Sequence, residues 1–328
     1  MWEVVGSNPI TSTIPPRTLC AVFCYTVPIM NGGGSREDEA LASEIREFDF
    51  EKQFAQPESI PFRGGYVQVW DLRQKRETPN SLPIVFIPGW GASPRVYKDS
   101  LRIYHASGRR VVTVAFSPKV EEVEKEGIPR ALFTKAIAVL HVLKEKRIQK
   151  ADAIGYSEGT VILQIAAHEE ACRFRNFVFQ APTSLMGKSS YIQIFKMEFR
   201  NLLQLLRVAR NVSPEEKERI ERKRKDVLAW FQGRGFIAGG WDGIQPGRFE
   251  ASYLFEKLQQ CPEQHRIGII AAKDDQMIDF EKVAKRANEL QVASFEEIQG
   301  GHQTFEIKAI ESAEATKRIL HMLENSHQ

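Results

Sequence analysis

Ser157 lies at the centre of the pentapeptide Gly155-Tyr156-Ser157-Glu158-Gly159, between a short apolar run and a helical pattern. Glycine two residues away on each side permits a tight strand-to-helix turn, because a side chain at either position would clash with neighbouring backbone. Such a turn projects the serine hydroxyl above a sheet, at the N-terminus of a helix whose dipole favours negative charge. The spacing therefore predicts a nucleophile elbow, with Gly155 and Gly159 as its two glycines.

A serine hydroxyl is a weak nucleophile unless a base takes its proton, and His302 is the histidine we expect in that role. The chain has seven histidines, and this one follows two glycines in a loop just past the last expected strand. The base in turn needs a carboxylate that holds one tautomer. Asp274 and Asp275 both follow an apolar strand pattern at 267–271. We prefer Asp275 because it heads the turn 275–278, which makes Asp274 a solvated neighbour or a hydrogen-bond partner.

A tetrahedral oxyanion requires two donors, and backbone N–H groups are the expected ones. One is the amide of Glu158, directly after the serine. The other is expected from the loop after the first long buried strand, where Gly89 and Gly91 permit close backbone approach; we choose the amide of Trp90. Because the serine, the histidine and the amides supply nucleophile, base and electrophilic stabilisation, we expect no cofactor and no metal.

Composition excludes several classes of partner. The chain has 328 residues, 42% hydrophobic and 27% charged, with a net charge of +3, as in ordinary globular proteins. No basic block with interleaved aromatics indicates nucleic-acid binding. The four cysteines have no metal-ligand spacing, which favours a cytoplasmic protein. No apolar run reaches the roughly 20 residues of a membrane span, and nothing indicates an oligomeric state.

The first 35 residues do not match the rest of the chain. The segment 18–30 is apolar enough for a signal peptide or anchor, in which case the protein is exported or tethered. A disordered tail is a second interpretation. A third is a leader translated from upstream DNA, because Gly6-Ser7-Asn8-Pro9 is what one reading frame of the T-arm of a tRNA gene encodes, with the true start at Met30.

Strand patterns alternate with helical ones along most of the chain, which predicts an α/β protein with a mostly parallel central sheet and helices on both faces. We expect strands at 66–70, 83–87, 110–116, 151–155, 174–179, 267–271 and 292–298, and helices at 128–147, from 157 onward and at 307–323.

Residues 184–259 break this alternation and indicate an inserted helical lid. An apolar helical pattern covers 191–208, and a second helix is expected from Ser213, with Pro214 at its first position and Glu216 completing a capping box. Between 185 and 250 there are 13 Lys and Arg against 8 Asp and Glu, a net charge of +5, whereas the rest of the chain sums to −2.

We interpret the charges of the second helix as a solvated face, with pairs four residues apart. The apolar side of the first helix could line an acyl pocket or simply pack on the core. The expected pairs are Glu215–Arg219, Glu218–Arg222 and Glu221–Lys225, and the apolar side consists of Phe195, Phe199, Leu202 and Leu206.

The order Ser157, Asp275, His302 within alternating strands and helices resembles the α/β-hydrolase fold, in particular the lid-bearing serine hydrolases that include esterases, lipases and prolyl aminopeptidases. The resemblance implies Ser157 as nucleophile, Asp275 as acid, His302 as base, and Trp90 and Glu158 as oxyanion-hole donors. It divides the chain into a core at 36–184, a lid at 185–259 and a second core segment at 260–328. Pro88 stands where relatives commonly have histidine, which leaves the support of the oxyanion loop open.

The expected activity is hydrolysis of a carboxylic ester or related acyl bond of a small molecule through an acyl-serine intermediate. Two alternatives stay open. The same triad can cleave amide, thioester or carbon–carbon bonds or transfer acyl groups, because function depends on the pocket. The fold can also serve as a non-catalytic binding protein.

Overall fold

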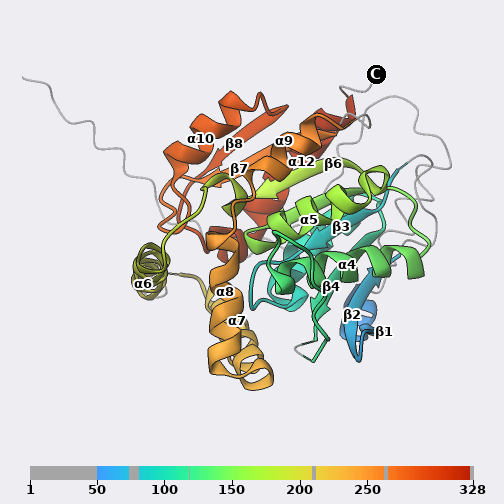
Figure 1. The fold of residues 1–328 in the computed structure, drawn as a ribbon, viewed down its shortest axis with the longest axis horizontal. Helices are drawn as coiled ribbons and strands as arrows, with labels where there is room; N and C mark the ends of the chain where they lie inside the picture. Colours follow the sequence, from blue (N-terminus) through green and yellow to red (C-terminus); the bar gives the residue numbers. More distant parts are fainter. Residues whose placement is uncertain (1–49, 74–80, 118, 209–211, 262–264, 326–328) are drawn as a thin grey trace, which may run out of the picture. The chain divides into compact units, whose positions relative to one another are not determined.

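The computed structural model describes residues 50–73, 81–117, 119–208, 212–261 and 265–325. The atypical first 35 residues lie outside the described part of the chain. The described chain forms an eight-stranded sheet with helices packed around it (Figure 1). Its strands are β1 (Glu58–Phe62), β2 (Gly65–Leu72), β3 (Ile84–Ile87), β4 (Val111–Phe116), β5 (Ala151–Tyr156), β6 (Phe174–Gln180), β7 (Arg266–Ala272) and β8 (Ser294–Ile298).

The strands lie in the order β1-β2-β4-β3-β5-β6-β7-β8. β2 runs antiparallel to both of its neighbours, and all other neighbouring strands are parallel. The predicted mostly parallel α/β sheet is therefore confirmed. Every residue of β3 and of β5 is buried, as expected for strands covered on both faces.

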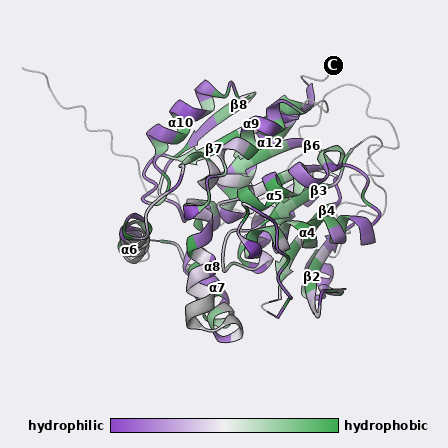
Figure 2. Ribbon diagram, in the orientation of Figure 1, coloured by the Kyte–Doolittle hydropathy of each residue, from purple (hydrophilic) through white to green (hydrophobic). Residues whose placement is uncertain are grey.

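Helices connect the parallel strands and cover both faces of the sheet. α4 packs on α5 and α5 on α9, while α12 packs on α3 and on the strands β6, β7 and β8. Figure 2 shows hydrophobic central strands, with hydrophilic residues gathered on outer helices such as α10. The helices are α2 (Phe50–Ala55), α3 (Lys98–Ala106), α4 (Arg130–Glu145), α5 (Glu158–Glu169), α6 (Tyr191–Val208), α7 (Pro214–Arg234), α8 (Phe236–Arg248), α9 (Ser252–Gln259), α10 (Phe280–Glu289), α11 (Thr304–Ile307) and α12 (Ala309–Asn325), with 3-10 turns at Pro94–Tyr97, Ala171–Arg173 and Thr183–Leu185.

β1 is the strand that sequence patterning does not predict. It contains Pro61, which lacks a backbone N–H and within a strand is tolerated mainly at the edge of a sheet. The structure places β1 at that edge, in a hairpin with β2. Arg63 and Gly64 turn the chain with positive φ angles of 42° and 71°. Pro61 thus breaks the strand pattern in the sequence, but it does not prevent the strand from forming.

The connection between β6 and β7 contains helices α6 to α9, after the 3-10 turn Thr183–Leu185 (Figure 1). Leu254, Phe255 and Leu258 of α9 are buried in the main hydrophobic core. Within the described ranges, no helix is both long enough and apolar enough to cross a membrane.

The residues of chemical interest lie at the carboxyl ends of four parallel strands, along one edge of the sheet. Trp90 follows β3, Ser157 follows β5, Asp275 follows β7 and His302 follows β8. The carboxyl ends of parallel strands meet at a single edge, which is where open α/β sheets bind their ligands. The topology therefore brings together residues that are up to 212 positions apart in the sequence.

The opposite edge of the sheet is held by a buried charge network around Asp152. This carboxylate is fully buried and accepts hydrogen bonds from Arg109, from both nitrogens of the Arg175 fork and from the amide of Asn176. Glu324 of α12 binds the same two arginines, at 3.1 and 2.9 Å. The network ties β5, β6 and the C-terminal helix together.

We expect Asp152→Ala to lower the free energy of unfolding by about 3–5 kcal/mol, because it leaves a buried arginine without its main counter-charge. Chemical denaturation monitored by circular dichroism measures the change. Glu51→Ala is the control, since its pairs with Lys98 and Arg102 are exposed, and we expect a loss of less than about 1 kcal/mol there. Equal losses in the two variants would contradict the assignment of Asp152 as a structural anchor.

Candidate active site

The turn at Ser157 has the strained backbone of a nucleophile elbow. Its φ of 51° and ψ of −115° lie in a region that side-chain-bearing residues rarely adopt. Hydrogen bonds on both sides hold this conformation: the Ser157 amide donates to the carbonyl of Gln180 at 2.9 Å, and Thr160 donates to the Ser157 carbonyl from its amide and its hydroxyl. The surrounding chain fixes the serine at the end of β5.

Gly155 and Gly159 are required by close backbone contact. A Cβ on Gly159 would lie 2.2 Å from the carbonyl oxygen of Ile87 in β3, and a Cβ on Gly155 would lie 2.9 Å from the carbonyl of Gly159. Real Cβ atoms do not approach backbone so closely. The first turn of α5 therefore packs directly against the neighbouring strand.

The structure brings Ser157, His302 and Asp275 into hydrogen-bonding contact. His302 Nε2 lies 3.2 Å from Ser157 Oγ, and His302 Nδ1 lies 2.8 Å from Asp275 Oδ2. All three residues are buried. Because a carboxylate only accepts hydrogen bonds, Nδ1 carries the proton that faces Asp275. The neutral ring then presents Nε2 as an acceptor to the serine hydroxyl.

Asp275, rather than its neighbour Asp274, faces the histidine. Its second oxygen, Oδ1, accepts hydrogen bonds from the amides of Met277 and Ile278 at 2.7 and 2.9 Å. This is the turn expected from the sequence, and it leaves Oδ2 directed at the imidazole. Asp274 is exposed, and its carbonyl accepts from the side chain of Gln204.

Backbone contacts set the distance between the loops that carry Asp275 and His302. The amide of Asp274 donates to the carbonyl of Gly300 at 2.9 Å. Gly300 has a φ of 116°, and a Cβ there would meet the Thr304 hydroxyl at 2.2 Å. Tyr156, which sequence patterning did not single out, adds a bond from its hydroxyl to the carbonyl of His302 at 2.9 Å.

The pKa of His302 lies above its ordinary value. Burial lowers this pKa, but the negative charge of Asp275 and its hydrogen bond to the ring outweigh that effect. Lys223 lowers the pKa of His302 and Glu306 raises it, by smaller amounts. The aspartate thus makes the imidazole a better proton acceptor than burial alone would allow.

The loop after β3 carries the expected oxyanion donor Trp90. Its position is fixed by Gly89, where a Cβ would lie 2.9 Å from the ring of Tyr156. The other expected donor, the Glu158 amide, is the first N–H of α5 and has no acceptor within the helix. Trp90 and Glu158 line the same cavity as Ser157 and His302.

The support of this loop, left open by Pro88, comes from elsewhere. The hydroxyl of Tyr97 lies 3.5 Å from the Gly89 amide and donates to Glu306 at 2.9 Å. Asp226 of α7 accepts hydrogen bonds from the amide and the hydroxyl of Ser93, at 3.1 and 2.5 Å. A buried tyrosine and a carboxylate from the helical insertion therefore hold this loop.

The cavity above Ser157 has a volume of about 130 Å³. Its walls come from the elbow and the loops after β3, β7 and β8, from the segment 183–189, from α6 with Ile194 and Met197, and from the helices α7 and α8. The side chains of Phe195, Phe199, Leu202 and Leu206, which could have lined an acyl pocket, lie outside the described part of the structure.

α7 is docked on the core through its charged side, so its interpretation as a solvated face is wrong for that side. The capping box of Ser213 and Glu216 is present as predicted. Arg219, however, pairs with Asp99 at 2.8 Å rather than with Glu215, and Lys223 binds the buried Glu306 at 2.7 and 2.5 Å.

Of the expected pairs within α7, Glu218–Arg222 is present at 3.7 Å. Glu221 pairs with Arg224 at 2.8 Å instead of with Lys225. Charges three residues apart thus compete with those four apart on this helix. Lys223 and Glu306 line the cavity of Ser157, so one ion pair joins α7 to the candidate active site.

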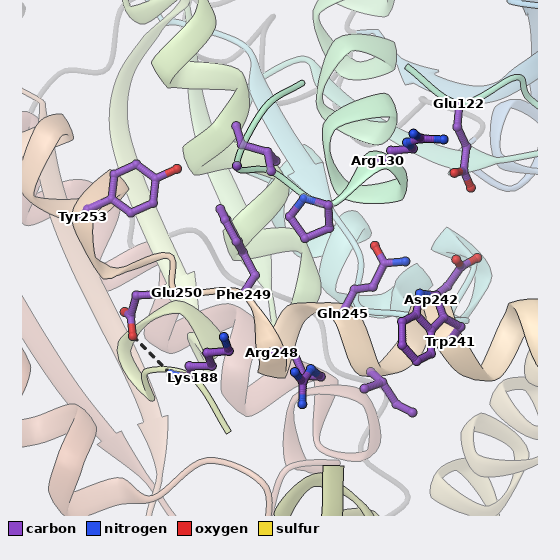
Figure 3. Close-up of a pocket in the computed structure, with 14 residues that line it drawn as sticks. Glu122, Arg130, Lys188, Trp241, Asp242, Gln245, Arg248, Phe249, Glu250 and Tyr253 are labelled. Atoms are coloured by element: carbon purple, nitrogen blue, oxygen red, sulfur yellow. Dashed lines mark hydrogen bonds between the residues drawn. The ribbon is translucent and has the colours of Figure 1, made fainter. Parts of the chain in front are cut away.

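A larger cavity of about 900 Å³ lies between α8 and the loop that precedes α4 (Figure 3). Figure 3 shows Arg130 and Glu122 on one side and Lys188, Glu250 and Tyr253 on the other. This cavity is not lined by Ser157, His302 or Asp275. Its lining contains three basic and three acidic side chains, so their charges are equal in number: Arg130, Lys188, Arg248, Glu122, Asp242 and Glu250. We therefore place the candidate chemistry in the smaller cavity, where the serine lies.

Within the described ranges, no group of three or more His, Cys, Asp or Glu side chains is placed to hold a metal ion. The arrangement at the sheet edge is a serine hydroxyl in contact with an imidazole that is held by a carboxylate. Groups in such contact can support acyl transfer through a serine oxygen.

Comparisons with solved structures identify the fold. The chain resembles a carboxylesterase of the thaumarchaeon Nitrososphaera gargenis, with 15% identity, a TM-score of 0.59, and coverage of 83% of this chain and 100% of that one. It also resembles a thermophilic esterase from Thermogutta terrifontis, with 14% identity, a TM-score of 0.57, and coverage of 82% and 99%.

A third similar structure is the 2-hydroxy-6-oxo-6-phenylhexa-2,4-dienoate hydrolase from Rhodococcus sp. strain RHA1, with 14% identity, a TM-score of 0.52, and coverage of 82% and 100%. No protein-family model and no curated protein sequence matches this chain. The chain has the α/β-hydrolase fold, as the order of its motifs predicted.

We expect Gly159→Ala to lower the free energy of unfolding by about 1–3 kcal/mol, because the added methyl group collides with the carbonyl of Ile87. Thermal denaturation measures the change. Gly240→Ala is the matched control, since nothing lies within 4 Å of a Cβ there, and alanine in a helix is favoured over glycine by about 0.5–1 kcal/mol. A Gly159→Ala protein as stable as the unmodified one would contradict the packing of α5 on β3.

Proposed function

We propose that this protein is a serine hydrolase that cleaves a carboxylic ester or related acyl bond of a small molecule. The observation that carries the proposal is the unbroken chain of contacts from Ser157 Oγ to His302 Nε2, and from His302 Nδ1 to Asp275 Oδ2. A strained turn presents the serine in a cavity, and the fold is one whose solved neighbours include esterases.

In the proposed reaction, His302 removes the proton of Ser157 as the oxygen attacks the acyl carbon. The amides of Trp90 and Glu158 donate to the oxyanion that forms. The imidazolium then protonates the leaving group, which departs and leaves an acyl-serine. Water enters, His302 takes its proton, and the attack of the resulting hydroxide on the acyl carbon releases the acid and restores the serine.

The same groups can also act on amides, thioesters or carbon–carbon bonds, transfer an acyl group to an alcohol, or be retained in a binding protein. No observation in the cavity favours one of these over ester hydrolysis. A panel that varies acyl length and leaving group among esters, thioesters and amides separates the enzyme alternatives. Absence of turnover together with absence of probe labelling would favour a binding protein.

We expect a fluorophosphonate probe to label the protein at Ser157, and Ser157→Ala to abolish that labelling, because the alanine has no oxygen to attack phosphorus. Peptide mapping by mass spectrometry locates the adduct. Hydrolysis of short p-nitrophenyl esters falls in the same variant by on the order of 10⁶-fold. Labelling that persists in Ser157→Ala would rule out this nucleophile.

We expect the esterase rate to rise with pH as His302 loses its proton, with a midpoint above the ordinary histidine pKa of about 6.5, since Asp275 raises this pKa. Asp275→Asn removes that charge and leaves burial, which lowers the pKa of His302, as the largest remaining effect. The midpoint then moves to lower pH, and the plateau falls on the order of 10³–10⁴-fold.

The measurement is kcat/KM for a p-nitrophenyl ester across the pH range in which both proteins are folded. Asp274→Asn is the matched control, because the exposed Asp274 side chain does not contact His302. We expect its profile to follow that of the unmodified protein. If Asp274→Asn and Asp275→Asn reduce the rate equally, Asp275 is not the orienting acid.

A further inference from the structure

The elbow residue Glu158 places a buried carboxylate directly beside the proposed nucleophile. Both of its oxygens accept hydrogen bonds from the ammonium of Lys135 on α4, each at 2.8 Å. The two side chains are 4% and 8% exposed, so the pair is shielded from water. Glu158 borders the cavity of Ser157 and a second cavity of about 210 Å³ behind the loop 88–93, and Lys135 lines the latter.

Stability does not by itself explain a charge pair at this position. A buried ion pair is often no more stabilising than apolar side chains of similar volume, because both ions lose their hydration. The elbow itself requires only the backbone amide of Glu158. Removing one partner, however, is costly, since it strands a charge in a medium of low polarity.

The charge of Glu158 bears directly on the proposed chemistry. Its amide is one of the two groups expected to receive the oxyanion, and its side chain is negative. A second negative charge that develops next to a buried carboxylate raises the energy of the transition state, because charges interact strongly where water is excluded. A cation held on that carboxylate cancels most of this repulsion.

Other charged groups near Glu158 do not perform this task. Asp242 of α8 acts on Glu158 with the same sign of charge. Asp226 of α7 borders the second cavity and binds Ser93. Lys223 lines the cavity of Ser157, but its ammonium is bound to Glu306. Among the described residues that line these two cavities, Lys135 is the lysine or arginine bound to Glu158.

We propose that Lys135 is a positioning residue for catalysis: it neutralises Glu158 and fixes its side chain, so that the adjacent amide can stabilise an oxyanion at neutral and alkaline pH. This inference rests on the proposed serine hydrolase function and assigns a further residue to the same site. It accounts for a buried lysine on α4 that the triad chemistry does not use.

The direction of the pKa shift of Glu158 defines the test. Burial raises the pKa of this carboxyl, and Lys135 lowers it in opposition. Without Lys135 the pKa rises further, so Glu158 is neutral at low pH and becomes an uncompensated anion as the pH increases. The activity of the unmodified enzyme rises with pH as His302 loses its proton, and then stays at a plateau. The activity of the Lys135→Met enzyme rises in the same way and then falls as Glu158 ionises.

The experiment measures kcat and KM for p-nitrophenyl acetate, and the rate of fluorophosphonate labelling of Ser157, across the pH range of folding. For Lys135→Met we expect kcat at alkaline pH to fall on the order of 10- to 100-fold with KM nearly unchanged, and the deficit to shrink at acidic pH. Lys135→Arg keeps the cation and should keep the alkaline plateau. The double variant Lys135→Met with Glu158→Gln removes both charges and should recover most of the rate lost in the single variant.

Arg110→Met is the matched control for loss of a buried cation. Arg110 pairs with Asp71 at 2.8 Å, both side chains are 10% exposed, and the pair lies at the start of β4, at the end of the sheet opposite Ser157. We expect it to lower the melting temperature without changing the shape of the pH profile. A bell-shaped profile in Arg110→Met would show that general destabilisation, and not the charge beside the oxyanion, produces the effect.

If Lys135→Met does not fold, Lys135→Gln provides the comparison, because its amide can still donate a hydrogen bond to Glu158 but carries no charge. It should show the same loss of rate at alkaline pH. An unchanged pH profile in a folded Lys135→Met or Lys135→Gln protein would overturn the role of Lys135. An unmodified protein that neither hydrolyses the ester nor reacts with the probe would instead overturn the proposed function, and this inference with it.

Discussion

The left-handed backbone of Ser157 is the constraint on which the rest of the site depends. This backbone conformation is unfavourable for a serine. It persists because the Ser157 amide donates a hydrogen bond to β6 and the Ser157 carbonyl accepts hydrogen bonds from Thr160. The close approach of Gly159 to β3 fixes the first turn of α5 against the sheet. The sheet order then brings the loops of β7 and β8 to the same edge, where the histidine contacts both the serine and the aspartate.

Charged side chains join the helical insertion to this edge, beside an edge-to-face ring contact of Phe231 with Trp90. Lys223 reaches the buried Glu306, which also receives the hydroxyl of Tyr97. Asp226 from the same helix holds the loop that carries Trp90. The insertion, the oxyanion loop and the loop of His302 therefore share one network, and a displacement of α7 would alter the support of all three.

Much of the fold follows from local pattern, because buried parallel strands and the elbow have strong sequence signals. Continuous apolar runs predicted the central strands, and the spacing of Gly155 and Gly159 predicted the turn. The edge strand β1 was not predicted, because Pro61 breaks the pattern of an interior strand, although an edge strand tolerates proline. The turn at 275–278 pointed to Asp275, since a carboxylate that heads a turn has one oxygen bound by backbone and one free.

The contacts of α7 could not be predicted in this way. Its charges are visible in the sequence, but Asp99 lies 120 residues from Arg219 and Glu306 lies 83 residues from Lys223. The local pattern therefore predicts ion pairs between charged side chains of the same helix and not with these distant acids. Tyr156 and Lys135 were missed for a related reason, because only the folded chain shows that one braces the His302 loop and the other meets Glu158.

The small volume beside Ser157 has a consequence for the timing of a catalytic cycle. About 130 Å³ is well below the 300–1,000 Å³ of common ligand pockets, and part of its wall consists of α7 and α8. If Ser157 acts as proposed, a reactant larger than this volume can enter only when α7 or α8 moves, which requires the ion pairs between α7 and the core to separate. Entry and release would then limit the rate more than bond cleavage, and added salt, which weakens ion pairs, would raise that rate.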